Sequence, residues 1–316
     1  MTAKQKVLEL LESSRDRYLS GEEIASGIGL TRNSVWKAVQ VLRKEGYAIE
    51  ASTNRGYRIR EDSDIFSAEG LEPFLMKGIP RENLHVYSSL RSTNRTAKEM
   101  AVSGAPDGSV ILADSQTEGR ARREGGFFSP PGGIYISFIL RPPAFPFTAD
   151  RTLTAYGGVC AAEAVASAAG IRPVIRGVND LEVNGKKICG IMTETLREAE
   201  SGKTEWIVTG IGLNFRVMDE EIPGELRKRV SSLYPDGHPR ILRNRLAAEL
   251  INMILIRGRL MTEEEVMQFC VDLPRYKRPR KIIFADVVRN ATGKIDKPKL
   301  RERYKAVRIV EEQNMS

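Results

Sequence analysis

Residues 179–190, NDLEVNGKKICG, read as a strand, a tight turn and a second strand. An Asn-Gly pair between strand-like runs is typical of a hairpin turn. The hairpin places Asn179 and Asp180 at one end and Lys187 on the returning strand. A carboxylate that can hold Mg²⁺ near a fixed ammonium group could activate an acid on ATP. Lys186 and Lys187 could equally be exposed strand residues, and this pattern alone does not separate the two interpretations.

The segments on both sides of the hairpin predict an α+β domain over residues 66–258. Helical periodicity covers residues 93–103, 152–169 and 242–257. Strands that bracket long helices, with hairpins between them, favour an α+β sheet over a doubly wound one. The strand-like runs are Leu84–Tyr87, Gly108–Ala113, Ile134–Leu140, Val174–Ile175, Leu181–Val183, Ile188–Thr193 and Trp206–Leu213.

A segment rich in glycine and arginine, residues 119–126 (GRARREGG), lies between two of these strands. Glycines let backbone amides face an anion, and Arg120, Arg122 and Arg123 can neutralise phosphate or carboxylate oxygens. The segment therefore suits a nucleotide. An ordinary flexible basic loop would have the same composition, and the motif alone favours neither interpretation.

Residues 1–62 have the pattern of a winged helix-turn-helix. Two short helices joined by a Gly turn follow the helix-turn-helix plan, and an added wing makes DNA binding a more specific interpretation than a plain three-helix core. The expected elements are helices over 4–11, after the Ser20 cap up to Gly29, and over 32–45, followed by wing strands over 47–50 and 56–60.

The outer face of the third helix carries the candidate DNA contacts Arg32, Asn33, Ser34 and Lys37. Short polar and cationic side chains there can reach base edges and phosphates in a major groove. A solvated helix face would have the same residues. Residues 61–64 are acidic and have no apolar periodicity, so we predict a domain boundary there.

Composition limits the class of protein. The 316 residues, 41% hydrophobic and 28% charged, predict two or three domains, and no apolar run is long enough to cross a membrane. The N-terminus lacks the uninterrupted apolar segment of an export signal, so we expect a cytoplasmic protein. The net charge of +8 lies mainly in residues 270–316, with 13 Lys and Arg against 6 Asp and Glu, and does not by itself indicate DNA binding.

Cysteine and histidine contents exclude several kinds of site. The three widely spaced cysteines, Cys160, Cys189 and Cys270, form neither a disulfide framework nor a metal-binding spacing. The two histidines, His85 and His238, give little basis for a histidine metal site or a Ser/His/Asp relay. Catalysis would therefore depend on Lys, Arg, Asp, Asn and backbone groups.

Several motifs, taken in order, resemble those of the biotin protein ligases. Residues 1–60 also resemble the winged helix of the subgroup that represses the biotin operon. The resemblance runs from about residue 1 to about residue 258. The matching motifs are Ser92-Thr93-Asn94, Gln116 with the 119–123 loop and Phe128-Ser129-Pro130, Asn179-Asp180, the hairpin with Lys187 and Gly190-Ile191, and GIGLN at residues 210–214.

The resemblance implies a class II synthetase-like α+β ligase domain and a two-step reaction. Biotin and ATP, with Mg²⁺, would give biotinyl-AMP, and a lysine of a biotin carboxyl carrier protein would then take the biotin. The resemblance further implies that the bound adenylate promotes a homodimer, which binds a palindromic operator.

By position, the resemblance also implies roles for particular residues. Lys187, Arg120 and Arg122 would be catalytic, and Asp180 would hold the metal ion. The residues implied for biotin are Ser92, Thr93, Asn94, Gln116, Gly119, Arg120, Ala121, Arg122, Lys187 and Gly190. The residues implied for ATP are Arg122, Arg123, Asn179, Asp180 and Asn214.

This chain departs from the family pattern in the loop and before the hairpin. Ala121 and Glu124 stand where the family usually has glycine, Gly125 stands where an arginine usually follows, and Gly177 removes an aromatic wall. An alanine at a position of positive φ strains a loop, and Glu124 adds negative charge near a phosphate path. These changes favour an alternative, a transcriptional regulator with an impaired ligase site that senses biotin or a related acid.

Residues 262–316 differ from the small β-barrel that ends other family members. Segments 262–266, 276–280 and 289–295 resemble the C-terminal end of acyl-CoA synthetases, which are adenylate-forming ligases, so we predict a small α/β tail. Lys294 matches the lysine that reaches the acyl carboxylate and phosphate in that family. It could close over the ligase site, or the tail could be a relic of gene fusion that only packs as an appendage.

Overall fold

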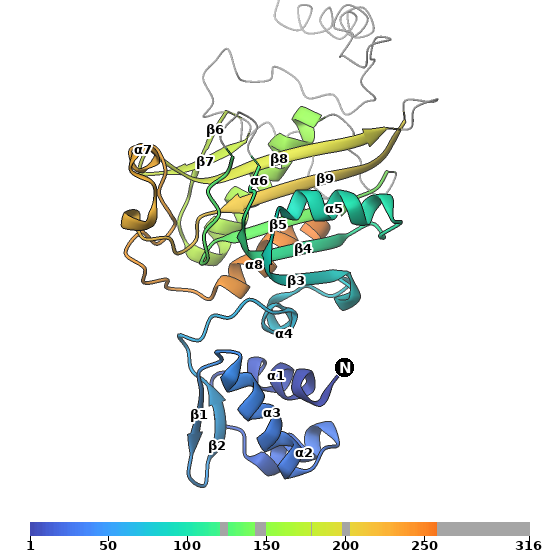
Figure 1. Ribbon diagram of the computed structural model, residues 1–316, viewed down its shortest axis with the longest axis vertical. Coiled ribbons are helices and arrows are strands. Elements are labelled where there is room, and N and C mark those ends of the chain that lie inside the picture. Colours follow the sequence, from blue (N-terminus) through green and yellow to red (C-terminus); the bar gives the residue numbers. More distant parts are fainter. Residues whose placement is uncertain (121–125, 143–149, 178, 198–202, 258–316) are drawn as a thin grey trace, which may run out of the picture.

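In the computed structural model, a small N-terminal domain lies at one end of an elongated molecule, next to a larger sheet domain (Figure 1). The structure describes residues 1–120, 126–142, 150–177, 179–197 and 203–257. The predicted C-terminal tail, with Lys294, lies outside the described residues.

The N-terminal domain is a winged helix-turn-helix, as predicted. Thr2 and Ser20 each cap a helix through the backbone N–H three residues on, and Gly29, with a φ of 66°, ends the second helix. β1 and β2 pair antiparallel and form the wing. The elements are α1 (Ala3–Glu12), α2 (Gly21–Ile28), α3 (Arg32–Lys44), β1 (Ile49–Ser52) and β2 (Gly56–Ile59). Their shared core includes Val7, Leu11, Ile24, Val35, Val39, Leu42 and Ile59.

A seven-stranded sheet of order β3-β4-β5-β9-β8-β7-β6 forms the larger domain within the described residues. β3 and β4 pair in parallel, and every other neighbouring pair is antiparallel. The mixed sheet confirms the predicted α+β class. The strands are β3 (Leu84–Leu90), β4 (Ser109–Gln116), β5 (Ile134–Leu140), β6 (Val174–Arg176), β7 (Asp180–Val183), β8 (Lys186–Arg197) and β9 (Thr204–Leu213).

Helices cover both faces of the sheet because successive side chains of a strand point to opposite faces. Ile111 of β4 packs with Ala97 and Ala101 of α5 (Thr93–Val102) on one face. Val110 and Leu112 belong to the core on the other face, with α6 (Asp150–Ala169) and α8 (Arg243–Asn252) (Figure 1). No described helix is long and apolar enough to cross a membrane. The shorter segments are α4 (Ala68–Leu71), η1 (Glu72–Phe74), η2 (Arg81–Asn83), η3 (Asp219–Glu221), α7 (Gly224–Arg227) and η4 (Met253–Arg257).

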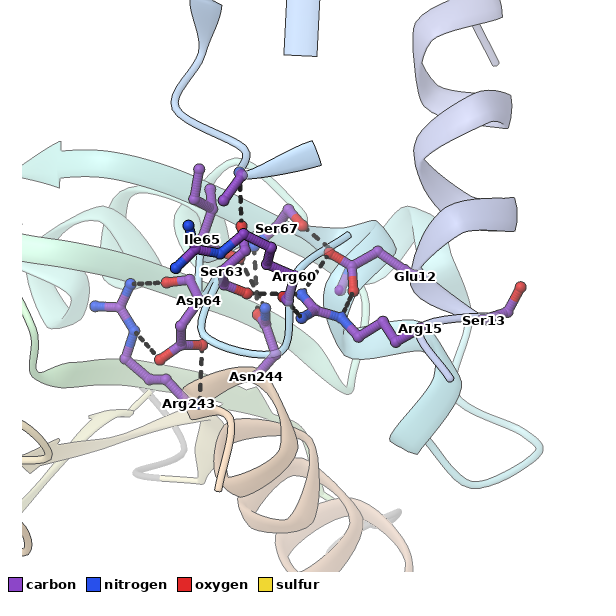
Figure 2. Close-up of polar contacts among 12 residues, drawn as sticks. Glu12, Ser13, Arg15, Arg60, Ser63, Asp64, Ile65, Ser67, Arg243 and Asn244 are labelled. Carbon is purple, nitrogen blue, oxygen red and sulfur yellow. Dashed lines mark hydrogen bonds and ion pairs between the residues drawn. The ribbon is translucent and has the colours of Figure 1, made fainter. Parts of the chain in front are cut away.

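Residues 61–64, where we predicted a domain boundary, contact both domains (Figure 2). Arg15 lies just after α1, pairs with the buried Glu12 at 2.6 Å and donates to the carbonyl oxygen of Ser63 at 2.8 Å. Asp64 has a side chain only 5% exposed and accepts a hydrogen bond from the backbone N–H of Arg243 at 2.9 Å. Burial raises the pKa of both Glu12 and Asp64. Ser63 and Asp64 are therefore anchored by contacts to the two domains, whereas Glu61 and Asp62 are exposed.

Candidate active site

A pocket of about 60 Å³ lies where the N-terminus of α5 meets the ends of β4, β8 and β9. The pocket brings together groups from α5, which begins after Ser92, and from β4, β8 and β9. These four elements are far apart in the sequence. The pocket is lined by Ser92, Thr93, Asn94, Gln116, Arg120, Phe127, Asn179, Lys187, Gly190, Ile191, Met192, Gly210, Ile211 and Gly212.

Most of the described residues that the resemblance implied for biotin line this pocket. Asn179, implied for ATP, lines it too. Six of the lining residues were not among the predicted site residues, although Ile191 and residues 210–212 belong to the matching motifs. They are Phe127, Ile191, Met192, Gly210, Ile211 and Gly212. The alternation of glycines at 210 and 212 within a strand was the available signal, because strand glycines often mark the close approach of another group.

A hydrogen-bonded chain fixes the Gln116 side chain. Its Oε1 accepts from the backbone N–H of Thr93 at 2.8 Å and from the Thr93 hydroxyl at 3.2 Å. Its Nε2 donates to Oγ of Ser129 at 2.9 Å, and that hydroxyl donates to the carbonyl oxygen of Phe127 at 2.8 Å. The amide orientation of Gln116 is therefore set by its partners on both sides.

The side chain of Asn94 is also fixed by hydrogen bonds, and its partners come from β8 and β5. Its Nδ2 donates to Oε2 of Glu194 at 3.0 Å and to the carbonyl oxygen of Met192 at 3.3 Å. Its Oδ1 accepts from the hydroxyl of Ser137, which is fully buried, at 2.7 Å. Asn94 is itself buried, so its amide is fixed within the wall of the pocket.

Lys187 lies on the returning strand of the predicted hairpin, which the structure confirms. Its Nζ pairs with Oδ1 of Asp180 at 2.7 Å, and Nδ2 of Asn179 donates to the same oxygen at 2.6 Å. The ammonium group also lies 5.7 Å from the ring centroid of Phe127. The side chain is 28% exposed, so the charged group stays accessible at the edge of the pocket.

Three residues implied by the resemblance are described but are not among the lining residues. Asp180 lies behind Lys187, as its partner. The carbonyl oxygen of Gly119 accepts from the backbone N–H of Phe127 at 2.8 Å, which closes the base of the loop. Asn214 is buried, and its Nδ2 donates to the carbonyl oxygen of Ser231 at 3.0 Å. Ala121, Arg122, Arg123, Glu124 and Gly125 lie outside the described residues.

Gly210 and Gly212 have no side chains, and this leaves room for Asn94 and Phe127 in the pocket wall. A Cβ atom at Gly212 would lie 2.6 Å from the Phe127 ring, and one at Gly210 would overlap the amide of Asn94. A movement of Asn94 away from such a Cβ atom would break hydrogen bonds, because its amide is hydrogen-bonded on both sides. The absence of a side chain at both positions is therefore a packing requirement.

Replacing Gly210 with alanine should lower the free energy of unfolding by about 1–3 kcal/mol, because the added methyl group overpacks a buried, hydrogen-bonded site. Urea denaturation of the full chain measures this. Gly224→Ala is the matched control, since a Cβ there meets nothing within 4 Å. Equal stability of the two variants would contradict the tight packing around Asn94.

The candidate DNA face lies on α3. Arg32, Asn33 and Lys37 are exposed, and Arg32 forms an ion pair with Glu22 of α2. Ser34 has a local partner instead, because its hydroxyl lies 2.9 Å from the hydroxyl of the helix cap Thr31. Exposed cations on the surface of a helix are compatible with phosphate contacts.

The fold and the pocket together define a class of protein, a ligase-type α+β domain joined to a DNA-binding domain. Residues 86–214 match the biotin/lipoate A/B protein ligase family, and residues 4–58 match an HTH domain. The bifunctional ligase/repressor BirA of Bacillus subtilis is 34% identical over 233 residues, 73% of this chain and 71% of that protein. The chain belongs to the biotin protein ligase family, among the homologues of the BirA ligase/repressors.

Two further comparisons concern parts of the chain. A solved structure of a mutant biotin protein ligase from Aquifex aeolicus, in complex with biotin, has a TM-score of 0.50 and 26% identity, and the match covers 60% of this chain and 75% of that one. The long-chain-fatty-acid–CoA ligase FadD13 of Mycobacterium tuberculosis is 48% identical over 48 residues, 15% of this chain and 10% of that protein. FadD13 is named as an acyl-CoA ligase, the class that we predicted residues 262–306 to resemble.

Proposed function

We propose that this protein forms biotinyl-AMP from biotin and ATP and transfers the biotin to a lysine of a biotin carboxyl carrier protein. The observation that carries the proposal is the position of Lys187, whose ammonium group borders a pocket lined by Asn94 and Gln116. The two amides can hold the head of a small acid. The ammonium group can stabilise negative charge that develops at its carboxylate and at the α-phosphate.

The hydrogen-bonding capacity of the pocket fits the cyclic urea of biotin, which has one carbonyl oxygen and two N–H groups. Oδ1 of Asn94 accepts one hydrogen bond from Ser137, and a carbonyl oxygen has a second lone pair. Nε2 of Gln116 donates one N–H to Ser129, and an amide nitrogen carries a second. The pocket therefore combines an acceptor and a donor whose orientations are already set.

The nucleotide is assigned to the side of the pocket with Arg120, Asn179 and Lys187. Arginine and lysine neutralise phosphate oxygens there. Asp180 and Asn179 supply the oxygen donors that Mg²⁺ prefers, and this ion is commonly held by one or two carboxylates together with substrate phosphates. These residues would hold Mg²⁺, which supplies further neutralisation of phosphate charge when bound.

Exchange of pyrophosphate into ATP tests the adenylation step. With the full chain, Mg²⁺ and labelled pyrophosphate, we expect exchange that depends on added biotin. Transfer is tested by adding a biotin carboxyl carrier protein and following its gain in mass. Biotin binding without biotin-dependent exchange would contradict the ligase proposal.

That outcome would favour the second candidate, a regulator that senses biotin or a related acid through an impaired ligase site. One observation supports it. Gly177 has a φ of 69°, a left-handed conformation that side chains rarely adopt, directly before the hairpin that carries Asn179. The backbone at this edge of the pocket is thus built for glycine in place of a large wall residue.

We also propose that the winged helix binds operator DNA as a homodimer that biotinyl-AMP promotes. Replacing Arg32 and Lys37 together with alanine should weaken DNA binding and lower the slope of log K against log salt by up to about 2, since each cation neutralises about one phosphate. Fluorescence anisotropy of a labelled biotin-gene promoter fragment, at several salt concentrations with biotin and ATP present, measures both quantities.

The control for this experiment has the same change in charge elsewhere. Lys77 and Lys228 are exposed residues of the sheet domain, and their double alanine variant should keep the original salt dependence. If both double variants have the same slope as the unaltered chain, α3 does not contact the phosphates.

A further inference from the structure

We propose that Glu194 is a positioning residue for the biotin pocket, acting through the amide of Asn94. This inference rests on the proposed ligase function. Glu194 lies on β8, beyond the residues of that strand that line the pocket, and is not itself a lining residue. It was not among the residues that the sequence indicated for the site.

The carboxylate of Glu194 joins three side chains near the pocket. Its Oε2 accepts from Nδ2 of Asn94 at 3.0 Å, and its Oε1 accepts from Nζ of Lys98 at 2.8 Å. A guanidinium nitrogen of Arg120 lies 4.0 Å from the same Oε1. The side chain is 22% exposed, so it is partly removed from water. Hydrogen bonds to an ionised acceptor are stronger than those between neutral groups.

An ionised carboxylate can only accept hydrogen bonds, and this determines which way the Asn94 amide points. Nδ2 must face Oε2 of Glu194, because the flipped amide would set two oxygens against each other. The carbonyl oxygen of Met192 takes the other N–H of Nδ2. The amide of Asn94 therefore has no N–H left for a ligand, and Oδ1 is its only ligand-facing function, an acceptor.

Lys98 keeps Glu194 in its acceptor role. The lysine comes from α5, the same helix that begins with Thr93 and Asn94, so the ion pair ties this helix to β8. The carboxylate of Glu194 is thereby fixed where it can orient the amide of Asn94.

This arrangement makes a specific prediction about ligands. The acceptor at Asn94 selects a ligand that presents an N–H there, as a ring urea does. Glu194→Gln replaces the pure acceptor with an amide that can present either an oxygen or an N–H, so residue 194 no longer opposes the flipped Asn94 amide and only the Met192 carbonyl oxygen does. A ligand N–H would then meet the Nδ2 group in a share of the molecules.

Steady-state exchange kinetics of the full-length Glu194→Gln variant test the inference. We expect the KM for biotin to rise about 10- to 100-fold, the range for a hydrogen bond to a charged group, with the KM for ATP changed less than about threefold. A role through charge alone predicts the opposite sign, since loss of a negative charge beside Arg120 and Lys98 would favour anionic ligands. Titration calorimetry with biotin checks that KM follows affinity.

Two further variants complete the design. Glu99→Gln makes the same chemical change on the exposed side of α5, where Glu99 is 65% exposed and pairs with Arg95, and should leave both KM values unchanged. In an Asn94→Ala background, Glu194→Gln should add little further loss, because the two residues act through one hydrogen bond.

The outcomes separate this inference from the proposed function. If the unaltered chain neither binds biotin nor catalyses exchange, both proposals fail. If the unaltered chain is active and Glu194→Gln leaves the KM for biotin unchanged or lowers it, only the role of Glu194 fails. Additive effects of Glu194→Gln and Asn94→Ala would also overturn it, since they would show that Glu194 acts without Asn94.

Discussion

Replacing Lys187 with methionine should reduce biotin-dependent ATP–pyrophosphate exchange by about 100- to 1000-fold, the range found when one fixed group that stabilises transition-state charge is removed. The ammonium group is the fixed cation that the hairpin holds at the pocket. Methionine keeps an unbranched apolar side chain beside Phe127, so the packing changes little while the charge is lost. Initial exchange rates at saturating ATP and biotin measure the effect.

The variant should fold normally, which makes the loss of rate interpretable. Asp180 loses its partner, but its side chain is 30% exposed and water can solvate the carboxylate, so we expect the free energy of unfolding to change by less than about 1 kcal/mol. Lys186→Met removes the same charge from the neighbouring strand position and should retain full exchange. Exchange within about threefold of the unaltered rate in Lys187→Met would place the catalytic charge elsewhere.

The position of Lys187 could be predicted because it depends on a local signal. Asn184 and Gly185 have φ values of 52° and 75°, and the two-residue hairpin turn that Asn-Gly favours requires positive φ at both positions. Such a turn sets the register of the two strands. The sequence therefore placed Lys187 on the returning strand before any tertiary contact was known.

The partner of Asn94 could not be predicted in the same way. Glu194 is separated from Asn94 by 100 residues, and an acidic residue in an alternating strand pattern usually faces solvent. The role of Glu194 depends on α5 packing over β4, β5 and β9 so that the side chains of Asn94 and Lys98 reach the next strand, β8, and hydrophobic periodicity does not determine this placement. The same holds for residues 61–64, where an acidic run indicated a domain boundary and the buried partner of Asp64 lies 179 residues away.

Replacing Arg243, the buried partner of Asp64, should have the second large effect, on the free energy of unfolding. Arg243→Met should lower the free energy of unfolding by about 3–5 kcal/mol, the usual cost of leaving one member of a buried ion pair without its partner. The Arg243 side chain is 5% exposed, pairs with Asp114 of β4 and donates to the carbonyl oxygen of Gly133 at 3.2 Å. It also donates to the carbonyl oxygen of Asp64 at 3.2 Å (Figure 2). It also lies 4.8 Å from the ring centroid of Phe66. Methionine can fill part of this space but can neutralise neither carboxylate.

Urea denaturation of the full chain, followed by the fluorescence of the buried Trp206, measures the loss in the sheet domain. Arg245→Met on the exposed side of α8 is the matched control and should stay within about 0.5 kcal/mol of the unaltered chain. Adding Asp64→Asn to Arg243→Met should recover part of the loss, because the uncompensated charge is then removed. A loss below about 1 kcal/mol would show that Asp64 is solvated when Arg243 is absent.

The change of this stability deficit with pH provides a second test of the prediction. Burial already raises the pKa of Asp64 above its ordinary value of 3.8, against the lowering effect of Arg243, so losing the arginine raises it further. A carboxyl group whose pKa is higher in the folded state binds its proton more tightly there, so lowering the pH through that pKa stabilises the folded state relative to the unfolded one. The deficit of Arg243→Met should therefore be complete above the pKa that Asp64 has in the folded variant, and should shrink as the pH falls toward the lower pKa that Asp64 has in the folded unaltered chain. A deficit that stayed constant over this range would mean that the lost stability comes from packing against Phe66 and not from the stranded carboxylate.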